Sequence, residues 1–353
     1  MKAAVWHGYK DVRIEELPVP SIPAGHVRIR VAYAGICGTD RHEYVGPNFI
    51  PVAKPHRLTG RTAPLTLGHE FTGVIEAVGE GVTGWKQGDR VTANGTLCCK
   101  KCAMCCSGRY NVCEKLGFLG VGIDGAFADY VVVDADRLFR VPDAVTLRQG
   151  ALAEPLACGI HATRLLGDIT GSAVVVVGPG IIGLACMLAA KFAGAGKILV
   201  AGVGKDRKEL VESYGCAYHD VLEGDLVPVI QEWNGGDLAD VVYECVGSQR
   251  TLDSAISALR PGAKLMVMGV FEKKPVFDMN TFQEGERTLY TSQAHVDEIG
   301  TALSYLEQGL INAEELITRE VTLDTLIQDG FEELIVNGPK HIKVMIRIGG
   351  GKE

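Results

Sequence analysis

The clearest indication of the fold comes from one segment, SAVVVVGPGIIG, which runs from Ser172 to Gly183. Its first half is a continuous apolar run, as expected of a strand buried on both faces in a parallel sheet. Its second half holds the pattern Gly-x-Gly-x-x-Gly and leads into apolar, helix-like sequence. Between a strand and a helix, such glycines allow a tight turn and bring a pyrophosphate close to the amides at the helix start. The segment therefore predicts a dinucleotide site formed by Gly178, Gly180, Ile181, Ile182 and Gly183.

The alternation of strands and helices continues after this segment. We expect strands at residues 197–201, 239–245 and 263–269, with helices at 206–214 and 249–259. Such alternation is typical of a doubly wound parallel sheet in an α/β protein.

The regions on either side of this alternation have a different pattern. Short alternating runs separated by proline and glycine turns predict strands near the N-terminus, and a last strand is expected at 341–348. We therefore predict one β-rich domain, residues 1–157 and 293–353, interrupted by a nucleotide-binding domain at 158–292.

Composition excludes several classes of partner. The chain has 353 residues and a formal net charge of -8, with acidic and basic residues interspersed, so we expect neither nucleic acid nor an anionic membrane as a partner. The sequence has no apolar run long enough for a membrane span, and its first residues do not resemble a secretion signal. Eleven cysteines in such a chain indicate reduced thiols and metal ligands, and we expect a cytoplasmic location.

Four of the cysteines lie in one short loop with regular spacing. Two residues separate Cys99 from Cys102 and Cys102 from Cys105, and seven separate Cys105 from Cys113. Four thiolates in one loop suit a tetrahedral structural zinc ion, which would hold together a lobe too small for its own core. An iron–sulfur cluster is the alternative, since it also uses four cysteines. Cys98 and Cys106 lie off this spacing, and we interpret them as bystanders.

A second group of metal-binding residue types comes from two glycine-flanked turns. Cys37 follows Gly35-Ile36, and His69 and Glu70 follow Gly68. A thiol, an imidazole and a carboxylate suit zinc, and three protein ligands leave one coordination place open for a substrate oxygen. The simpler interpretation is a buried cysteine and a satisfied polar pair. Two adjacent residues of a strand point to opposite faces, so His69 and Glu70 can share one ion only if the backbone bends at the glycine.

An acidic residue in an apolar segment is a further candidate. Glu154 stands just before a proline and opens a helical stretch. It could be a ligand of the same metal ion or a cap of the following helix, and the sequence favours neither.

Residues close to Cys37 could move the proton of an alcohol. Thr39 and His42 follow Cys37 by two and five residues, so one short helix would hold a ligand, a hydroxyl relay and an imidazole. Taken alone, Thr39 would be interpreted as a capping hydroxyl and His42 as a surface histidine. Beside the metal ligands we favour the relay, with Asp40 orienting His69.

Taken together, these motifs resemble those of the zinc-dependent medium-chain dehydrogenase/reductase family, over essentially the whole chain. The segments that carry the resemblance are Cys37-Gly38-Thr39-Asp40, Gly68-His69-Glu70, the four-cysteine loop, Glu154-Pro155-Leu156-Ala157 and Gly178–Gly183. Within the family, residues 55–60 and 117–120 are most similar to the polyol branch of butanediol, sorbitol and threonine dehydrogenases.

The resemblance implies a GroES-like catalytic domain and a Rossmann domain. It also implies a catalytic zinc on Cys37, His69 and Glu70, with Glu154 as fourth ligand or nearby base, and a structural zinc on Cys99, Cys102, Cys105 and Cys113. A homodimer or homotetramer assembled through the nucleotide-binding domains follows from the same resemblance. Lys343 matches a position that often faces the nicotinamide end of the cofactor.

One position departs from the pattern of NAD-using relatives. There the second strand of the nucleotide fold ends in an acid that binds the adenosine ribose, whereas this chain has Gly202. Without a carboxylate, a 2′-phosphate is not repelled, and Lys205 and Arg207 could bind one. The simpler interpretation is a charged helix start capped by Asp206. NAD and NADP both stay open.

These features together predict an NAD(P)-linked zinc enzyme. It would oxidise a secondary alcohol of a diol, polyol or similar metabolite to a ketone, and reduce the ketone in reverse. A butanediol and acetoin pair or a sugar alcohol is the substrate we expect. The alternatives are a zinc-free quinone or enoyl reductase on the same scaffold and a non-catalytic nucleotide-binding protein.

Overall fold

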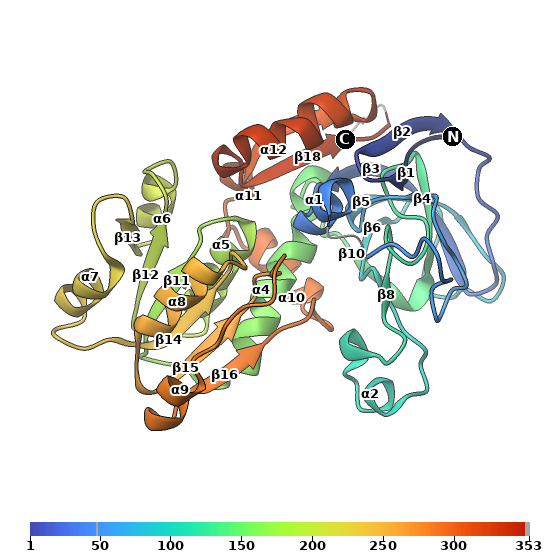
Figure 1. Ribbon diagram of the computed structural model, residues 1–353. Helices are drawn as coiled ribbons and strands as arrows, with labels where there is room; N and C mark the ends of the chain where they lie inside the picture. Colours follow the sequence, from blue (N-terminus) through green and yellow to red (C-terminus); the bar gives the residue numbers. More distant parts are fainter. Residues whose placement is uncertain (47–48, 350–353) are drawn as a thin grey trace. The chain divides into compact units, whose positions relative to one another are not determined.

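The structure is a computed structural model that describes residues 1–46 and 49–349 (Figure 1). The chain forms two compact units. The first consists of Met1–Glu154 and Ile299–Glu353, and the second of Pro155–Glu298.

The second unit is built on a six-stranded sheet in which every pair of neighbours is parallel. Its strands, in spatial order, are β13 (Ala217–Asp220), β12 (Lys197–Gly202), β11 (Ala173–Val177), β14 (Ala239–Glu244), β15 (Leu259–Val267) and β16 (Thr288–Thr291). All five residues of β11 are buried, as its continuous apolar sequence predicts.

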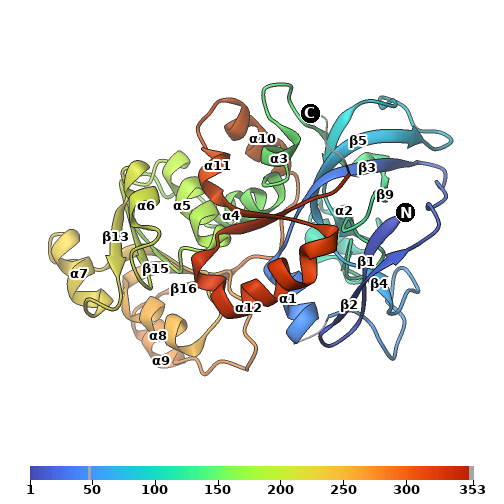
Figure 2. The ribbon, with the colours of Figure 1, turned by 90° about the horizontal axis from the view of Figure 1, so that it is seen from above.

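Helices cover both faces of this sheet. They are α4 (Ala153–Leu165), α5 (Ile181–Phe192), α6 (Lys208–Ser213), α7 (Leu226–Trp233), α8 (Gln249–Ser257) and α9 (Met279–Glu284). Figure 2 shows α5 and α6 on one face and α8 and α9 on the other. From β11 the chain adds β12 and β13 on one side, and it then returns to add β14, β15 and β16 on the other side. Doubly wound folds bind ligands at the point between β11 and β14 where the order of addition reverses. The predicted Rossmann architecture is therefore confirmed.

The first unit is mainly β structure. Its largest sheet has seven strands, ordered β10 (Leu138–Arg140), β6 (Arg90–Ala93), β5 (Glu70–Val78), β3 (His26–Gly35), β18 (Lys343–Arg347) and β17 (Ile317–Thr322), with β9 (Tyr130–Asp134) paired to β3. A second sheet contains β2 (Asp11–Glu16), β1 (Lys2–Gly8) and β4 (Leu65–Thr66), and a two-stranded sheet contains β7 (Thr96–Leu97) and β8 (Gly117–Phe118).

Short helices connect these strands. The α-helices are α1 (Gly38–Val45), α2 (Ala103–Cys106), α3 (Leu147–Gly150), α10 (Ile299–Glu307), α11 (Ala313–Leu316) and α12 (Glu333–Asn337), and a π-helix spans Leu326–Glu332. The apolar core lies between the sheets and includes Trp6, Ile29, Phe71, Phe127 and Phe331, each at most 1% exposed. Strand β3 ends at Gly35, two residues before Cys37, and β5 begins at Glu70, so these two central strands position one of the candidate metal sites.

Candidate metal centres and dinucleotide loop

The turn that carries Cys37 is stabilised by its own sequence. Strand β3 ends at Gly35, and α1 begins at Gly38 with Cys37 as its N-cap. The Cys37 N–H donates to Oδ2 of Asp40 at 2.9 Å, so the third residue of the helix closes the turn as in a capping box. Cys37 is thereby held at a helix start with its thiol half-buried.

The bend expected before His69 is present. Gly68 has φ +98°, a conformation that glycine adopts without strain, and Glu70 is the first residue of β5. The Sγ of Cys37, a ring nitrogen of His69 and a carboxylate oxygen of Glu70 all lie within 4.8 Å of one another. The structure therefore brings the three predicted ligands together. Glu154, which is also buried, does not belong to this group, and its role as fourth ligand or base stays a prediction.

Two buried polar atoms beside this group support a metal-binding arrangement. Nδ1 of His69 and Oδ1 of Asp40 have no hydrogen-bond partner and lie 4.0 Å apart. Burial lowers the pKa of His69, but the neighbouring Cys37 and Asp40 raise it well above its usual value. Burial raises the pKa of Asp40 to about 6, although His69 opposes this. A small rotation would let Asp40 accept from Nδ1, which leaves the other ring nitrogen for a metal ion.

Lys343 has a contact that the sequence did not indicate. Its Nζ lies 2.8 and 2.6 Å from the two carboxylate oxygens of Glu70 and donates to the carbonyl oxygen of Ile36 at 3.0 Å. Gly35 makes room for this pair, because a Cβ there would collide with the Glu70 carboxylate. The expected contact of Lys343 with the nicotinamide stays a prediction. A lysine inside the apolar strand sequence KVMIR is the signal that could have revealed a buried ion pair.

Thr39 and His42 lie on α1, three residues apart and therefore on the same side of the helix. Oγ1 of Thr39 is 3.7 Å from Sγ of Cys37. Both side chains are partly exposed. The hydroxyl is thus next to the proposed ligand, as a proton relay requires.

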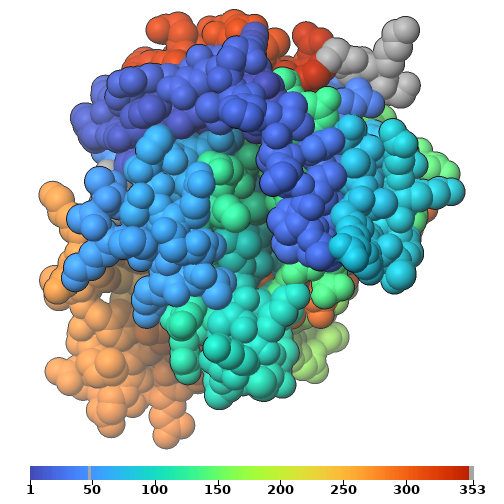
Figure 3. Space-filling view, turned by 90° about the vertical axis from the view of Figure 1, so that its right-hand side faces the viewer, coloured from blue at the N-terminus to red at the C-terminus, as the bar shows by residue number. Residues whose placement is uncertain are grey.

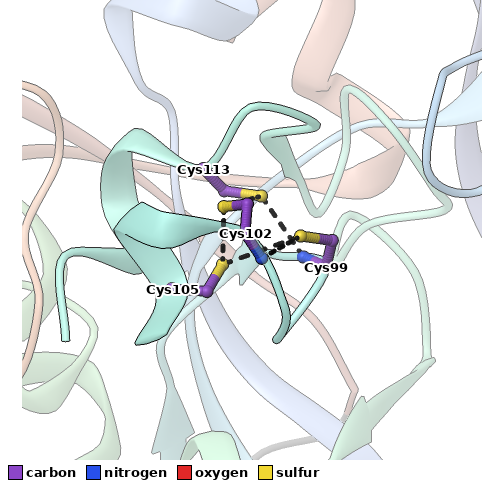
Figure 4. Close-up of side chains that lie close together, drawn as sticks. All are labelled: Cys99, Cys102, Cys105 and Cys113. Carbon is purple, nitrogen blue, oxygen red and sulfur yellow. Dashed lines mark hydrogen bonds between the residues drawn. The ribbon is translucent and has the colours of Figure 1, made fainter. Parts of the chain in front are cut away.

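The four cysteines of the loop form one cluster, in which all side chains point to a common centre (Figure 4). Their sulfur atoms are 3.5 Å apart for Cys102 and Cys105, and 3.9 Å apart for Cys99 and Cys105 and for Cys102 and Cys113. Four sulfurs bound to a tetrahedral zinc ion are ~3.8 Å apart, given Zn–S bonds of ~2.3 Å. The observed separations are close to those expected for four thiolates around one zinc ion.

Backbone amides favour the thiolate form at part of this cluster, while burial raises the pKa of Cys105. The N–H groups of Cys99 and Lys115 donate to Sγ of Cys113, and that of Cys102 donates to Sγ of Cys99, each at 3.3 Å. The amides of Cys105 and Glu114 lower the pKa of Cys102 to about 6. Amide donors favour the thiolate, which is the form that binds zinc.

The glycine-rich loop has the geometry that a pyrophosphate site needs. Gly178 has φ +98°, Gly180 is the N-cap of α5, and Ile181 and Ile182 begin the helix. A Cβ on Gly183 would collide with the carbonyl oxygen of Gly178, whereas one on Gly180 would meet nothing within 4 Å. The third glycine thus allows close packing of helix and turn, and the second leaves open space before the helix amides.

Two side chains pack closely against Gly202 at the end of β12. A Cβ on Gly202 would lie 2.5 Å from Oη of Tyr218 and 2.6 Å from Cγ of Pro179, so a larger residue requires one of these side chains to move. Tyr218, which the sequence did not single out, donates to the carbonyl oxygen of Gly204 at 2.6 Å. Lys205 is exposed and pairs with Glu223, while Arg207 is buried. A phosphate role for these two cations stays a prediction.

Comparisons with known proteins agree with this arrangement. Residues 23–143 match the alcohol dehydrogenase GroES-like domain, and residues 182–308 match the zinc-binding dehydrogenase family. The chain is 39% identical to (R,R)-butanediol dehydrogenase of Bacillus subtilis over 350 residues, which cover 98% of this chain and 99% of that protein. It is 32% identical to sorbitol dehydrogenase of Bacillus subtilis, over 98% and 97% of the two chains.

Solved structures give the same result. The crystal structure of 2R,3R-butanediol dehydrogenase from Bacillus subtilis has a TM-score of 0.90 at 38% identity and covers 98% of this chain and 99% of that chain. A zinc-binding dehydrogenase from Sinorhizobium meliloti bound to NADP has a TM-score of 0.88 at 29% identity, with 98% of each chain covered.

The fold and the site define an oxidoreductase that acts on CH–OH groups. More narrowly, the chain belongs to the zinc-dependent alcohol dehydrogenase family, within the medium-chain dehydrogenases, as the resemblance implied. Among the described residues, no helix combines the length and hydrophobicity that crossing a bilayer requires.

Proposed function

We propose that the protein is an NAD(P)-linked dehydrogenase that oxidises a secondary alcohol of a diol or polyol to a ketone and catalyses the reverse reduction. The observation that supports it most is the convergence of Cys37, His69 and Glu70 within 4.8 Å, in a chain with an intact dinucleotide loop. The named relatives that act on butanediol and sorbitol support the substrate class.

The residues around the site have distinct roles in this proposal. Cys37, His69 and Glu70 hold a catalytic zinc ion, and Cys99, Cys102, Cys105 and Cys113 hold a structural one. The catalytic ion would polarise the alcohol oxygen while the nicotinamide accepts the hydride. Thr39 relays the proton of the alcohol, accepting it while passing its own hydroxyl proton towards His42, which lies three residues further along the same helix and is partly exposed. Asp40 holds the Cys37 turn and orients His69.

The dinucleotide binds with its pyrophosphate at the start of α5, over Gly178 to Gly183. The absence of a side chain at Gly202 removes the acid that would select NAD, so we propose that the chain accepts NADP as well as NAD. Titration of the metal-loaded protein with each nucleotide, followed by the change in tryptophan fluorescence, measures both dissociation constants. NADP affinity far below that of NAD would contradict this assignment.

Assembly into a homodimer or homotetramer is also part of the proposal. Strand β16 is an edge strand of the parallel sheet, and Leu289 within it is 44% exposed; Val276 and Met279, earlier in the chain, are 78% and 65% exposed. Unpaired edges and exposed apolar side chains favour association with a second copy. Sedimentation velocity distinguishes a dimer or tetramer from a monomer. A cytoplasmic location fits the eleven cysteines, none of which forms a disulfide in the described part of the chain.

One experiment tests the reaction itself. The protein, loaded with zinc, is incubated with a panel of vicinal diols and sugar alcohols and either nicotinamide cofactor, and reduced cofactor is measured by absorbance. We expect turnover with at least one secondary alcohol of the panel, and loss of turnover after zinc removal. Full activity without metal would instead indicate a zinc-free reductase, and no activity with any substrate would indicate a non-catalytic protein.

A further inference from the structure

The four-cysteine lobe is closed at its base by a short pair of strands. We call this base the stem, which consists of Gly95–Leu97 and Gly117–Gly120. Thr96 pairs with Phe118 in the stem, and the N–H of Leu119 donates to the carbonyl oxygen of Gly95 at 2.9 Å. Both stem segments continue within a few residues into the cysteines of the lobe.

Both segments of the stem pack against the backbone that carries His69. A Cβ on Gly95 would be 3.4 Å from the Cβ of His69, and one on Gly120 would be 2.5 Å from the backbone nitrogen of Gly68. Beyond the stem, the N–H of Ala126 donates to the carbonyl oxygen of Gly68 at 2.9 Å. The position of His69 is therefore determined in part by where the stem lies.

One side of the stem borders a cavity, while Leu119 packs in the apolar core. The cavity, of about 570 Å³, has Gly95, Thr96, Leu97 and Leu119 in its wall. Figure 3 shows this face of the first unit, with a hollow between the blue N-terminal segments. Strands of two residues are too short to be stable alone. Inside the lobe, only Asn111 and Cys113 are buried between residues 98 and 113, so the lobe has no apolar core of its own.

We propose that the lobe positions His69 through the stem, so that a metal ion on the four cysteines strengthens metal binding by Cys37, His69 and Glu70. This inference rests on the proposed function, because it assumes that Cys37, His69 and Glu70 form a metal site, which we call the second site. The physical reason is that the ion orders the lobe, the ordered lobe fixes both stem segments, and the stem fixes the imidazole that must face the second ion. Metal binding by the lobe therefore strengthens metal binding at the second site. By thermodynamic linkage, metal binding at the second site strengthens binding by the lobe to the same degree.

The first test removes the lobe's ion without touching the stem. Cys102→Ser and wild-type protein, each supplied with zinc for the lobe, are titrated with Co²⁺, and the thiolate–cobalt absorption that is missing from matched Cys37→Ala proteins reports on the second site. We expect Cys102→Ser to bind Co²⁺ there about tenfold to a hundredfold more weakly, as for changes in the groups that orient a ligand. Unchanged affinity in a folded Cys102→Ser protein would overturn the proposal.

The second test moves the stem while the lobe keeps its ion. Gly120→Ala places a methyl group against Gly68 and strains a residue with φ +75°. Gly84→Ala strains a residue with φ +80° that has nothing within 4 Å, so it is the matched control for backbone strain. We expect only Gly120→Ala to weaken Co²⁺ binding at the second site and to shift its absorption bands. Equal affinity and equal spectra in both variants would contradict the proposal.

The two hypotheses fail in different ways. If wild-type protein shows no Cys37-dependent cobalt absorption, the second group is not a metal site and the proposed function fails. If that absorption is present but neither Cys102→Ser nor Gly120→Ala weakens it, the proposed function survives and the coupling fails.

Discussion

Lys343 and Glu70 form an ion pair in which both side chains are 1% exposed and both carboxylate oxygens face the ammonium group. Burial lowers the pKa of Lys343, but Glu70 and Cys37 raise it above its usual value, so the lysine stays charged. In the proposed metal site, the Glu70 carboxylate would therefore interact with both Lys343 and a metal ion beside Cys37 and His69. Lys343 compensates the buried carboxylate, and it would compete with an ion bound at the proposed site.

Replacing this lysine tests the competition. In Lys343→Met the Glu70 carboxylate is left buried without a partner, and we expect the metal-free protein to lose about 3–5 kcal/mol in its free energy of unfolding. Zinc would compensate the carboxylate, so it should stabilise the variant more than it stabilises wild-type protein. Urea denaturation with and without zinc measures both effects. An equal zinc effect in the two proteins would show that Glu70 does not contact the ion.

Loss of the thiol at Cys37 should abolish activity and preserve the fold. Cys37→Ala removes the sulfur ligand, and we expect turnover to fall at least ~100-fold, more than for loss of an outer group that only orients a ligand. The thiol is only half-buried, so the melting temperature should change little. Steady-state assays and circular dichroism check both statements. Wild-type turnover by zinc-depleted Cys37→Ala protein would refute the role.

Two glycines of the dinucleotide loop should respond differently to the same change. Gly183→Ala forces a methyl group against the carbonyl oxygen of Gly178, and such overpacking costs about 1–3 kcal/mol. Gly180→Ala meets no atom of the chain, so stability should be kept. Its methyl group would occupy the space of the pyrophosphate, and nucleotide affinity should fall. Thermal unfolding and nucleotide titration separate the two effects; a stable Gly183→Ala protein would argue against the close packing.

The carboxylate of Glu298 should make the stability of the second unit depend on acid pH. It is buried and accepts from Nδ1 of His161 and a guanidinium nitrogen of Arg164, each at 3.1 Å. Burial opposes ionisation, but the bonds from His161 and from the backbone of Val296 lower the pKa of Glu298 to about 2. A lowered carboxyl pKa stabilises the fold above the ordinary carboxyl range, and this contribution is lost as the pH falls from about 4.5 to about 2.

Glu298→Gln removes that dependence. We expect the variant to be less stable at neutral pH by on the order of 1–3 kcal/mol and to lose less stability between pH 4.5 and 2.5. Denaturant titrations across this range measure the difference. Parallel pH profiles for the two proteins would show that Glu298 does not carry the effect.

Local sequence was sufficient to predict an element where its burial pattern or its turn residues act over only a few positions. The valine run and glycines of 172–183 predicted β11, the turn and α5, because burial and turn chemistry act within a few residues. Strands β13, with the sequence AYHD, and β16, with TLYT, were not predicted, since neither has an apolar run. They form by pairing with β12 and β15, which is a tertiary effect.

The sequence by itself determined the residue types of the site, because the spacing of cysteines and glycines restricts which ligands a turn can present. Only the tertiary structure decided which groups meet: Lys343 is 273 positions from Glu70 yet neutralises it, and the stem of the cysteine lobe lies against His69. Contacts of this kind depend on how separate strands pack, and the free energy of that packing is not encoded in the neighbours of either residue.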